Sequence, residues 1–165
     1  MFFKFYEVDR EYIKYLKENG DNKIPNINYK KHNKFFCGVV LRINNLNYFA
    51  PVSSFCKKKN TVFLIKDKDK NKKLKSISSL RFSFMFLCPI DCLNQKDFSK
   101  EDKKYQTLLR KELLYCNKNK EKILKQAHGV YKLGLNEKSR DKFNICDFKK
   151  LEEKCLEYMQ LNDNI

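Results

Sequence analysis

The spacing of apolar residues changes near Asp97, and this change limits the folds that the chain can adopt. Before Asp97, short runs of aromatic and β-branched residues are separated by turn-forming residues, as in β-strands. After it, apolar residues recur at the spacing of amphipathic helices. Strands followed by helices predict an α+β fold, with a twisted antiparallel sheet and added helices that are mainly C-terminal.

The strands expected in the first half of the chain are residues 2–8, 35–43, 46–52, 61–65 and 80–90. Asn44 and Asn45 separate two of them, and such a pair favours a tight β-hairpin turn. Residues 24–33 are polar without a period, and residues 66–75 are highly charged. Both of these segments are therefore expected to be loops.

Helices are expected where a capping residue precedes an apolar stripe. Asp9 is a suitable N-cap for a short helix ending at Gly20, and Asp147 is a suitable N-cap for a last helix. Between them, the helical spacing passes through Tyr105, Leu108, Leu109, Leu113 and Leu114 and through Ile123, Leu124 and Ala127, with Gly129 and Gly134 as breakers. The length favours one domain over residues 1–165.

Cysteine usage and hydropathy exclude several classes of protein. The seven cysteines include no Cys-x-x-Cys pair, and only two histidines accompany them, so a zinc site is not expected. No stretch approaches the roughly 20 apolar residues of a membrane-spanning helix, and the first residues lack the layout of a signal peptide. We expect a cytoplasmic protein with reduced thiols, no metal, no cofactor and no membrane contact.

The positive charge is concentrated in one segment. Residues 22–90 contain fifteen Lys or Arg and two acidic residues, Asp67 and Asp69, whereas the segments before and after carry net charges of −1 and +4. An AT-rich genome is the alternative explanation, but it would raise lysine content everywhere without removing acidic residues from one segment. The concentration favours a polyanionic partner such as a nucleic acid.

The residues of this segment favour one route of phosphodiester cleavage over another. Two-metal catalysis needs clustered carboxylates, and Asp67 and Asp69 lie within a run of lysines. RNA can instead be cleaved by its own 2′-hydroxyl, if a protein orients that group and stabilises the charge that develops on the phosphate. Lysines and hydroxyl groups suffice for this second route.

Two clusters of such residues flank the expected hairpin. One contains Tyr29, Lys30, Lys31, His32 and Lys34, and the other contains Ser53, Ser54, Lys57, Lys58 and Lys59. Lys34 and Ser54 are almost equally far from the Asn44-Asn45 turn, so antiparallel pairing should bring them together. Taken singly, each residue has a structural explanation as a turn, a solvated face or a packed ring. Only their convergence favours a site.

Several segments resemble the pattern of a known family: Phe5-Tyr6, Tyr12 to Leu16, Lys34 to Leu41, Tyr48 to Ser54, Phe84-Met85, Pro89-Ile90, Tyr105 to Leu114, and Leu151 to Lys154. The most specific is Ala50-Pro51-Val52-Ser53-Ser54, which follows Tyr48-Phe49. With these segments the chain resembles the ToxN/AbiQ family, the endoribonuclease toxins of type III toxin–antitoxin and phage abortive-infection systems.

The resemblance implies a MazF/Kid-like barrel core with added helices. It implies metal-independent, sequence-preferring RNA cleavage that leaves a 2′,3′-cyclic phosphate and a 5′-hydroxyl, with cellular or phage mRNA as substrate. The implied antitoxin is a small repetitive RNA, which the toxin processes into pseudoknots that inhibit it in a closed protein–RNA complex. The implied role is phage abortive infection or plasmid maintenance.

The resemblance also implies the catalytic residues Tyr29, Lys34, Ser53, Ser54 and Lys57. Ser53 would position the scissile phosphate, Ser54 and Lys34 would transfer protons or stabilise charge, and Tyr29 would orient the nucleotide. Lys57 lies one position later than the second lysine of the family, and the interval from Tyr29 to Lys34 is one residue longer. The expected RNA-binding residues are Lys30, Lys31, His32, Lys58, Lys59, Lys66, Lys68, Lys70, Lys72, Lys73, Lys75 and Arg81.

Two other functions fit the same basic segment. A non-catalytic RNA-binding module would use Phe35, Tyr48 and Phe55 as stacking platforms for bases. Alternatively, the lysines would bind DNA or an acidic protein, and the helices would form a dimer surface.

Overall fold

A computed structural model of the chain describes residues 1–28 and 31–163. The strands in this part of the chain are β1 (Lys4–Val8), β2 (Phe36–Ile43), β3 (Leu46–Ser53), β4 (Val62–Lys68), β5 (Leu74–Arg81), β6 (Phe86–Leu87) and β7 (Leu93–Gln95). The helices are α1 (Arg10–Asn19), α2 (Lys103–Lys118), α3 (Lys120–Gly134), α4 (Glu137–Phe143) and α5 (Phe148–Asp163). The predicted α+β class, with antiparallel strands and mainly C-terminal helices, is confirmed.

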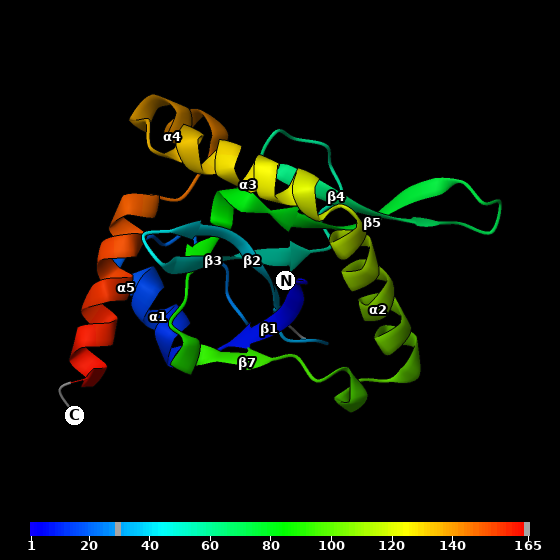
Figure 1. Cartoon of the computed structure of the whole chain (residues 1–165), viewed down its shortest axis with the longest axis horizontal. Coiled ribbons are helices and arrows are strands. Elements are labelled where there is room, and N and C mark those ends of the chain that lie inside the picture. Colours follow the sequence, from blue (N-terminus) through cyan, green and yellow to red (C-terminus); the bar gives the residue numbers. More distant parts are fainter. Residues whose placement is uncertain (29–30, 164–165) are drawn as a thin grey trace.

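The described strands form an antiparallel sheet in the order β4-β5-β3-β2-β1-β7. Strand β6 stands outside this order and pairs with β3. Figure 1 shows that α2 lies toward one end of the molecule, that α1 and α5 lie side by side at the other, and that α3 runs along one side from α2 to α4. The core between the sheet and the helices is rich in aromatic side chains. Within it, the Tyr48 and Tyr131 hydroxyls both donate to Glu152 Oε1 at 2.7 Å.

The β2–β3 hairpin has the predicted turn. Asn44 and Asn45 have φ angles of 48° and 65°, and residues with positive φ at both turn positions match the twist of a two-residue hairpin. Farther from the turn, the register shifts, because Leu41 pairs with Tyr48 whereas Gly38 already pairs with Phe49. Continuing the shifted register places Lys34 opposite Ser53, one residue from the predicted neighbour.

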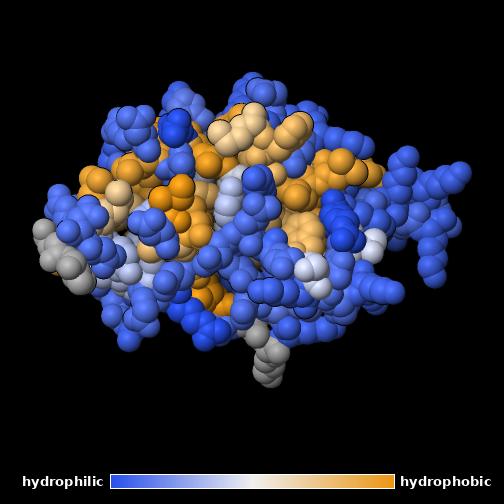
Figure 2. All heavy atoms as spheres, turned by 60° about the horizontal axis from the view of Figure 1, so that its bottom comes forward, coloured by the Kyte–Doolittle hydropathy of each residue, from blue (hydrophilic) through white to orange (hydrophobic). Residues whose placement is uncertain are grey.

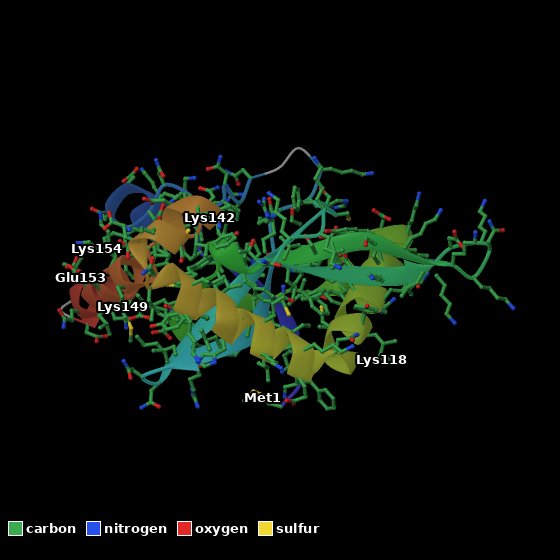
Figure 3. The ribbon with its side chains drawn as sticks, turned by 90° about the horizontal axis from the view of Figure 1, so that it is seen from above. Met1, Lys118, Lys142, Lys149, Glu153 and Lys154 are labelled. Carbon is green, nitrogen blue, oxygen red and sulfur yellow. The ribbon has the colours of Figure 1, made fainter. Side chains whose placement is uncertain are left out.

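The loop predicted over residues 66–75 is confined to residues 69–73, because β4 continues to Lys68 and β5 begins at Leu74. Strands β4 and β5 pair as far as Lys68 and Leu74, and together they form an arm that extends from the body of the protein (Figure 3). Asp69 shapes the turn between them, since its Oδ1 accepts the N–H groups of Asn71 and Lys73 at 2.8 and 2.9 Å. Toward the turn, ladder hydrogen bonds sustain the two strands without an apolar face, so the usual sequence signal is absent there.

Two further predictions are corrected. Residues 80–90 are not one strand, because the chain leaves β5 after Arg81, forms a 3-10 turn over Phe82–Phe84 and returns as the short β6. Gly129 does not break a helix but lies within α3, whereas Gly134 is its last residue, as expected. Strand β7 and helix α4 were not predicted.

The predicted N-caps are confirmed. Asp9 Oδ1 accepts the N–H of Glu11 at 2.8 Å, and Asp147 Oδ1 accepts the N–H of Lys150 at 3.2 Å. These contacts satisfy backbone donors that have no partner inside the helix. Helix α1 ends at Gly20, as predicted.

The seven cysteines are free thiols, and all except Cys56 are buried. Within residues 1–28 and 31–163, no cluster of His, Cys, Asp and Glu is arranged to hold a metal ion. A search of the helices in the same residues finds none with the length and apolar character needed to span a membrane.

Substitution of Gly38 tests the close contact between β2 and β3. A Cβ atom on Gly38 would lie 2.2 Å from Cδ1 of the Phe49 ring. Gly38→Ala should therefore lower the free energy of unfolding by about 1–3 kcal/mol or more. Gly129→Ala is the control, because nothing lies within 4 Å of its Cβ position; it should raise stability by roughly 0.5–1 kcal/mol. Urea unfolding would measure the stability of both variants. Equal stabilities of Gly38→Ala and the wild-type protein would contradict the expectation.

Candidate active site

A pocket of about 440 Å³ lies where the segment before β2, the end of β3, strand β5 and helix α2 meet. Its walls contain Lys34, Ser53 and Ser54, which the sequence predicted to converge. The complete lining is Lys31, His32, Asn33, Lys34, Phe35, Val52, Ser53, Ser54, Ile77, Ser78, Tyr105, Leu108 and Glu112.

The two serines have different surroundings. Ser53 pairs with Ser79 of β5 in the ladder, and its Oγ accepts the N–H of Phe55 at 3.2 Å. This contact uses the oxygen as an acceptor, so the hydroxyl proton remains available for donation to a ligand. Ser54 is the next residue, at the exit of the strand, and it is exposed.

Lys34 reaches the pocket from the segment before β2. Its backbone N–H donates to the Ile27 carbonyl at 2.9 Å, and its side chain is half-buried. Burial, followed by the nearby Arg81 charge, lowers the pKa of the Lys34 ammonium to about 8. An ammonium group with this pKa can release and regain a proton near neutral pH.

His32 and Tyr105 form an ordered wall of the pocket. Their rings are stacked with centroids 3.6 Å apart, and His32 Nδ1 lies 3.3 Å from Glu101 Oε2. The other oxygen of Glu101 pairs with Lys96 at 3.1 Å. A second pocket of about 600 Å³ shares His32 and Tyr105 with the first and reaches Asp67, near the end of β4.

Glu112 is a pocket residue that the sequence analysis missed. It is 3% exposed, and its Oε2 has no hydrogen-bond partner within residues 1–28 and 31–163. Burial raises the pKa of its carboxyl to about 7, although the Ser78 hydroxyl opposes this rise. Ser78 Oγ lies near the carboxyl but also makes no hydrogen bond with the described residues in the present arrangement.

A sequence signal for Glu112 does exist. Tyr105, Leu108 and Glu112 lie on one face of α2, and Leu109 and Cys116 continue that face into the core. A carboxylate in an otherwise apolar stripe is unusual, because Glu is almost never fully buried unless it is paired.

Three predicted catalytic or binding residues near β3 are not part of the pocket. Lys57, Lys58 and Lys59 are exposed in the segment after β3 and are not among the residues that line it. Tyr29 and Lys30 lie outside the described residues, so their predicted roles stay predictions.

The remaining predicted RNA-binding residues gather on the arm and at its base: Lys66, Lys68, Lys70, Lys72, Lys73, Lys75 and Arg81. The face of the arm that is visible in Figure 2 is hydrophilic toward its end. Asp69 pairs with Lys75 at 3.1 Å, and Asp67 pairs with Lys111 of α2 at 2.8 Å. The two acidic residues of the basic segment therefore hold the arm in shape and against the helix.

Two of the aromatic residues proposed as stacking platforms are not accessible. Phe35 is 6% exposed and Tyr48 is fully buried, so neither ring can receive a base. The Phe55 ring is covered by cations, with Arg81 Cζ at 4.6 Å and Lys59 Nζ at 5.3 Å from its centroid. The stacking assignment is therefore wrong for Phe35 and Tyr48.

Glu112→Gln tests the burial of this carboxyl. The unfolded chain ionises Glu112 near its ordinary pKa of 4.5, whereas the folded protein keeps the proton up to a pKa of about 7. Rising pH between these values removes protons from the unfolded state first and thus lowers stability. The free energy of unfolding of Glu112→Gln, relative to that of wild type, should therefore increase between about pH 5 and about pH 8, by at most about 3 kcal/mol.

Urea unfolding at both pH values would measure this gain. The control is Glu121→Gln, which removes the same charge from an exposed position at the start of α3. A pH-independent difference between Glu112→Gln and wild type would contradict the expectation.

Comparison with known proteins identifies the family. The model of the ToxN toxin of type III toxin–antitoxin systems matches residues 4–156. The endoribonuclease ToxN of Bacillus thuringiensis subsp. kurstaki is 31% identical, over 95% of this chain and 84% of its own length. The endoribonuclease AbiQ of Lactococcus lactis subsp. lactis is 31% identical, over 96% and 90%. The predicted enzyme class, endoribonuclease, agrees with the names of these relatives.

Solved structures agree with this assignment. One solved structure comes from a type III system in which a non-coding RNA pseudoknot selectively inhibits the toxin. It matches with a TM-score of 0.81 and 30% identity, over 96% of this chain and 99% of its own. Another is AbiQ, a lactococcal anti-phage endoribonuclease, with a TM-score of 0.80, 28% identity and coverage of 97% and 99%. The chain therefore belongs to the ToxN family of toxins of type III toxin–antitoxin systems.

Proposed function

We propose that this chain is a metal-independent endoribonuclease toxin that cleaves RNA through attack of the ribose 2′-hydroxyl. The observation that carries the proposal is the pocket in which Lys34, Ser53 and Ser54 meet, beside a lysine-rich arm. Family membership supports it, because the curated relatives are endoribonucleases. Residues 1–165 would act as one toxin domain, and the free thiols favour the reducing cytoplasm as its location.

The pocket offers what this reaction requires. Attack of the 2′-oxygen on the adjacent phosphorus adds negative charge to the phosphate oxygens before the 5′-oxygen departs, leaving a 2′,3′-cyclic phosphate and a 5′-hydroxyl. Donors placed where this charge develops lower the barrier. The Ser53 hydroxyl would hold the phosphate, and Ser54 and Lys34 would stabilise the added charge or transfer protons. We also keep Tyr29, as the residue that orients the nucleotide, and Lys57 as proposed participants.

The arm would bind the RNA backbone. Its lysines extend along paired strands, so together they could contact several phosphates of an RNA backbone. Lys31, Lys58 and Lys59 would add contacts nearer to the pocket. The second pocket, which joins Asp67 of the arm to the His32–Tyr105 stack, would receive nucleotides that flank the cleaved bond.

The inhibitor would be an RNA as well. A non-coding RNA pseudoknot inhibits the toxin in one related structure, and the same basic surface could hold such an RNA here. We propose a small repetitive RNA that the toxin processes and that then closes a protein–RNA complex around it. Release from this complex would expose cellular or phage mRNA to cleavage, in abortive infection or plasmid maintenance.

Replacement of the two serines tests the catalytic proposal. Ser53→Ala and Ser54→Ala should each lower the rate of RNA cleavage by about 10²-fold or more, because each removes a donor to the developing charge. The assay would use a labelled transcript in EDTA and would identify cyclic phosphate ends. Ser139→Ala in α4 is the matched control, because Ser139 lies outside the pocket.

Unchanged cleavage by both serine variants would remove these hydroxyls from the mechanism. If the wild-type protein binds the transcript but never cuts it, the proposed activity is wrong and the non-catalytic module takes its place.

A triple replacement on the arm tests backbone binding. Lys68→Gln, Lys70→Gln and Lys73→Gln together should weaken binding to all RNA sequences similarly and reduce the salt dependence of binding by roughly one unit of slope per lysine. Filter binding at several salt concentrations would measure this. The control removes the same charge from Lys118, Lys122 and Lys138, which are exposed on α2, α3 and α4. Equal slopes for the two triple variants would exclude the arm as the RNA-binding surface.

A further inference from the structure

The proposed mechanism gives no role to the carboxyl of Glu112, which lies in the pocket wall. This side chain comes from α2, lies in the wall that contains Lys34 and the two serines, and has a buried oxygen without a hydrogen-bond partner among the described residues. A buried polar atom that lacks a partner destabilises a fold, so its presence at a pocket needs an explanation. A ligand that donates a hydrogen bond would satisfy it.

We propose that Glu112 is the general base that accepts the proton of the attacking 2′-hydroxyl. The inference rests on the proposed endoribonuclease function and adds to it the group that activates the nucleophile. A hydroxyl donor suits the unpartnered oxygen, because a carboxylate accepts hydrogen bonds and a ribose 2′-hydroxyl can donate one.

The proton transfers balance within the pocket. As the 2′-oxygen forms its bond to phosphorus, its proton passes to the Glu112 carboxylate. The bond between phosphorus and the 5′-oxygen then breaks, and the 5′-oxygen takes a proton from the Lys34 ammonium. Afterwards, proton exchange with water returns Glu112 to the carboxylate and Lys34 to the ammonium.

The ionisation of the two groups suits these roles. Burial raises the pKa of the Glu112 carboxyl to about 7, and burial with the Arg81 charge lowers the pKa of Lys34 to about 8. A base and an acid work best when their pKa values lie near the working pH. The carboxylate must be ionised and the ammonium protonated, so activity should rise through about pH 7 and fall above about pH 8.

Other titratable and charged groups surround the carboxyl and would shift this profile. Burial, followed by the charge of Glu112, raises the pKa of Tyr105 to about 12 and also raises the pKa of the Cys56 thiol. Around the pocket, these groups are Tyr105 on the same helix, Lys31, His32 and Lys34 before β2, Cys56 after β3 and Arg81 at the end of β5.

The test compares pH–rate profiles of single-turnover cleavage, using a transcript that the wild-type protein cuts at a mapped position. Glu112→Gln keeps the shape of the side chain but cannot accept a proton, so the rate should fall by about 10²- to 10⁴-fold and the rise near pH 7 should vanish. RNA affinity should stay within about twofold, because the carboxyl accepts a proton rather than holding a phosphate. Glu121→Gln is the control and should retain the wild-type profile.

A substrate with sulfur in place of the bridging 5′-oxygen separates base from acid. A thiolate leaves without a proton, so Lys34→Met should regain most of its activity on this substrate, whereas Glu112→Gln should remain as impaired as before. Glu112→Asp keeps a carboxyl with a shorter reach and should retain the rise in the pH profile at a lower rate. This variant also serves if the glutamine protein does not fold.

The outcomes are distinct. If wild type cuts RNA and Glu112→Gln keeps the rise near pH 7, or if the sulfur substrate rescues Glu112→Gln, the general-base assignment is overturned while the endoribonuclease stands. If wild type cuts no RNA, the proposed function itself fails.

Discussion

Strand β3 bonds to neighbours along both of its edges, and the site depends on this arrangement. One edge pairs with β2, while the other pairs first with β6, at Tyr48 and Phe49, and then with β5, at Val52 and Ser53. The strand cannot slide without breaking ladders on both sides, so its last residues are fixed relative to β2 and β5. Ser53 and Ser54 thereby meet a segment that precedes β2, and α2 closes the remaining side.

The sequence predicted the parts of the fold that depend on local chemistry. The Asn44-Asn45 turn and the caps at Asp9 and Asp147 follow from residues a few positions apart, and all three are present. The arm was missed because its stability comes from pairing between strands, and its lysine-rich residues lack the apolar alternation of a half-buried strand. Gly129 was misplaced because neighbouring turns of α3 override the low helix propensity of one glycine.

The candidate site was predicted only in part, because some of its contacts follow from local sequence and others join distant segments. Hairpin geometry placed Lys34 near Ser53 and Ser54, but the register shift between Gly38 and Leu41, which determines the final pairing, has no clear local signal. Glu112 lies far along the chain from these residues, and only the packing of α2 against the sheet brings it to them. A long-range contact of this kind is beyond what spacing alone can show.

Strand β5 belongs both to the arm and to the wall of the pocket, to which it contributes Ile77 and Ser78. Near the body, Val62 and Ile65 of β4 are buried, whereas the residues toward the turn face solvent and depend mainly on ladder bonds and on Asp69. Replacing a lysine near the turn should therefore leave the core and the pocket in place. On the proposed function, substitutions at the end of the arm would alter RNA preference while the pocket stays unchanged, so related toxins could share one cleavage chemistry and differ in the RNA that inhibits each of them.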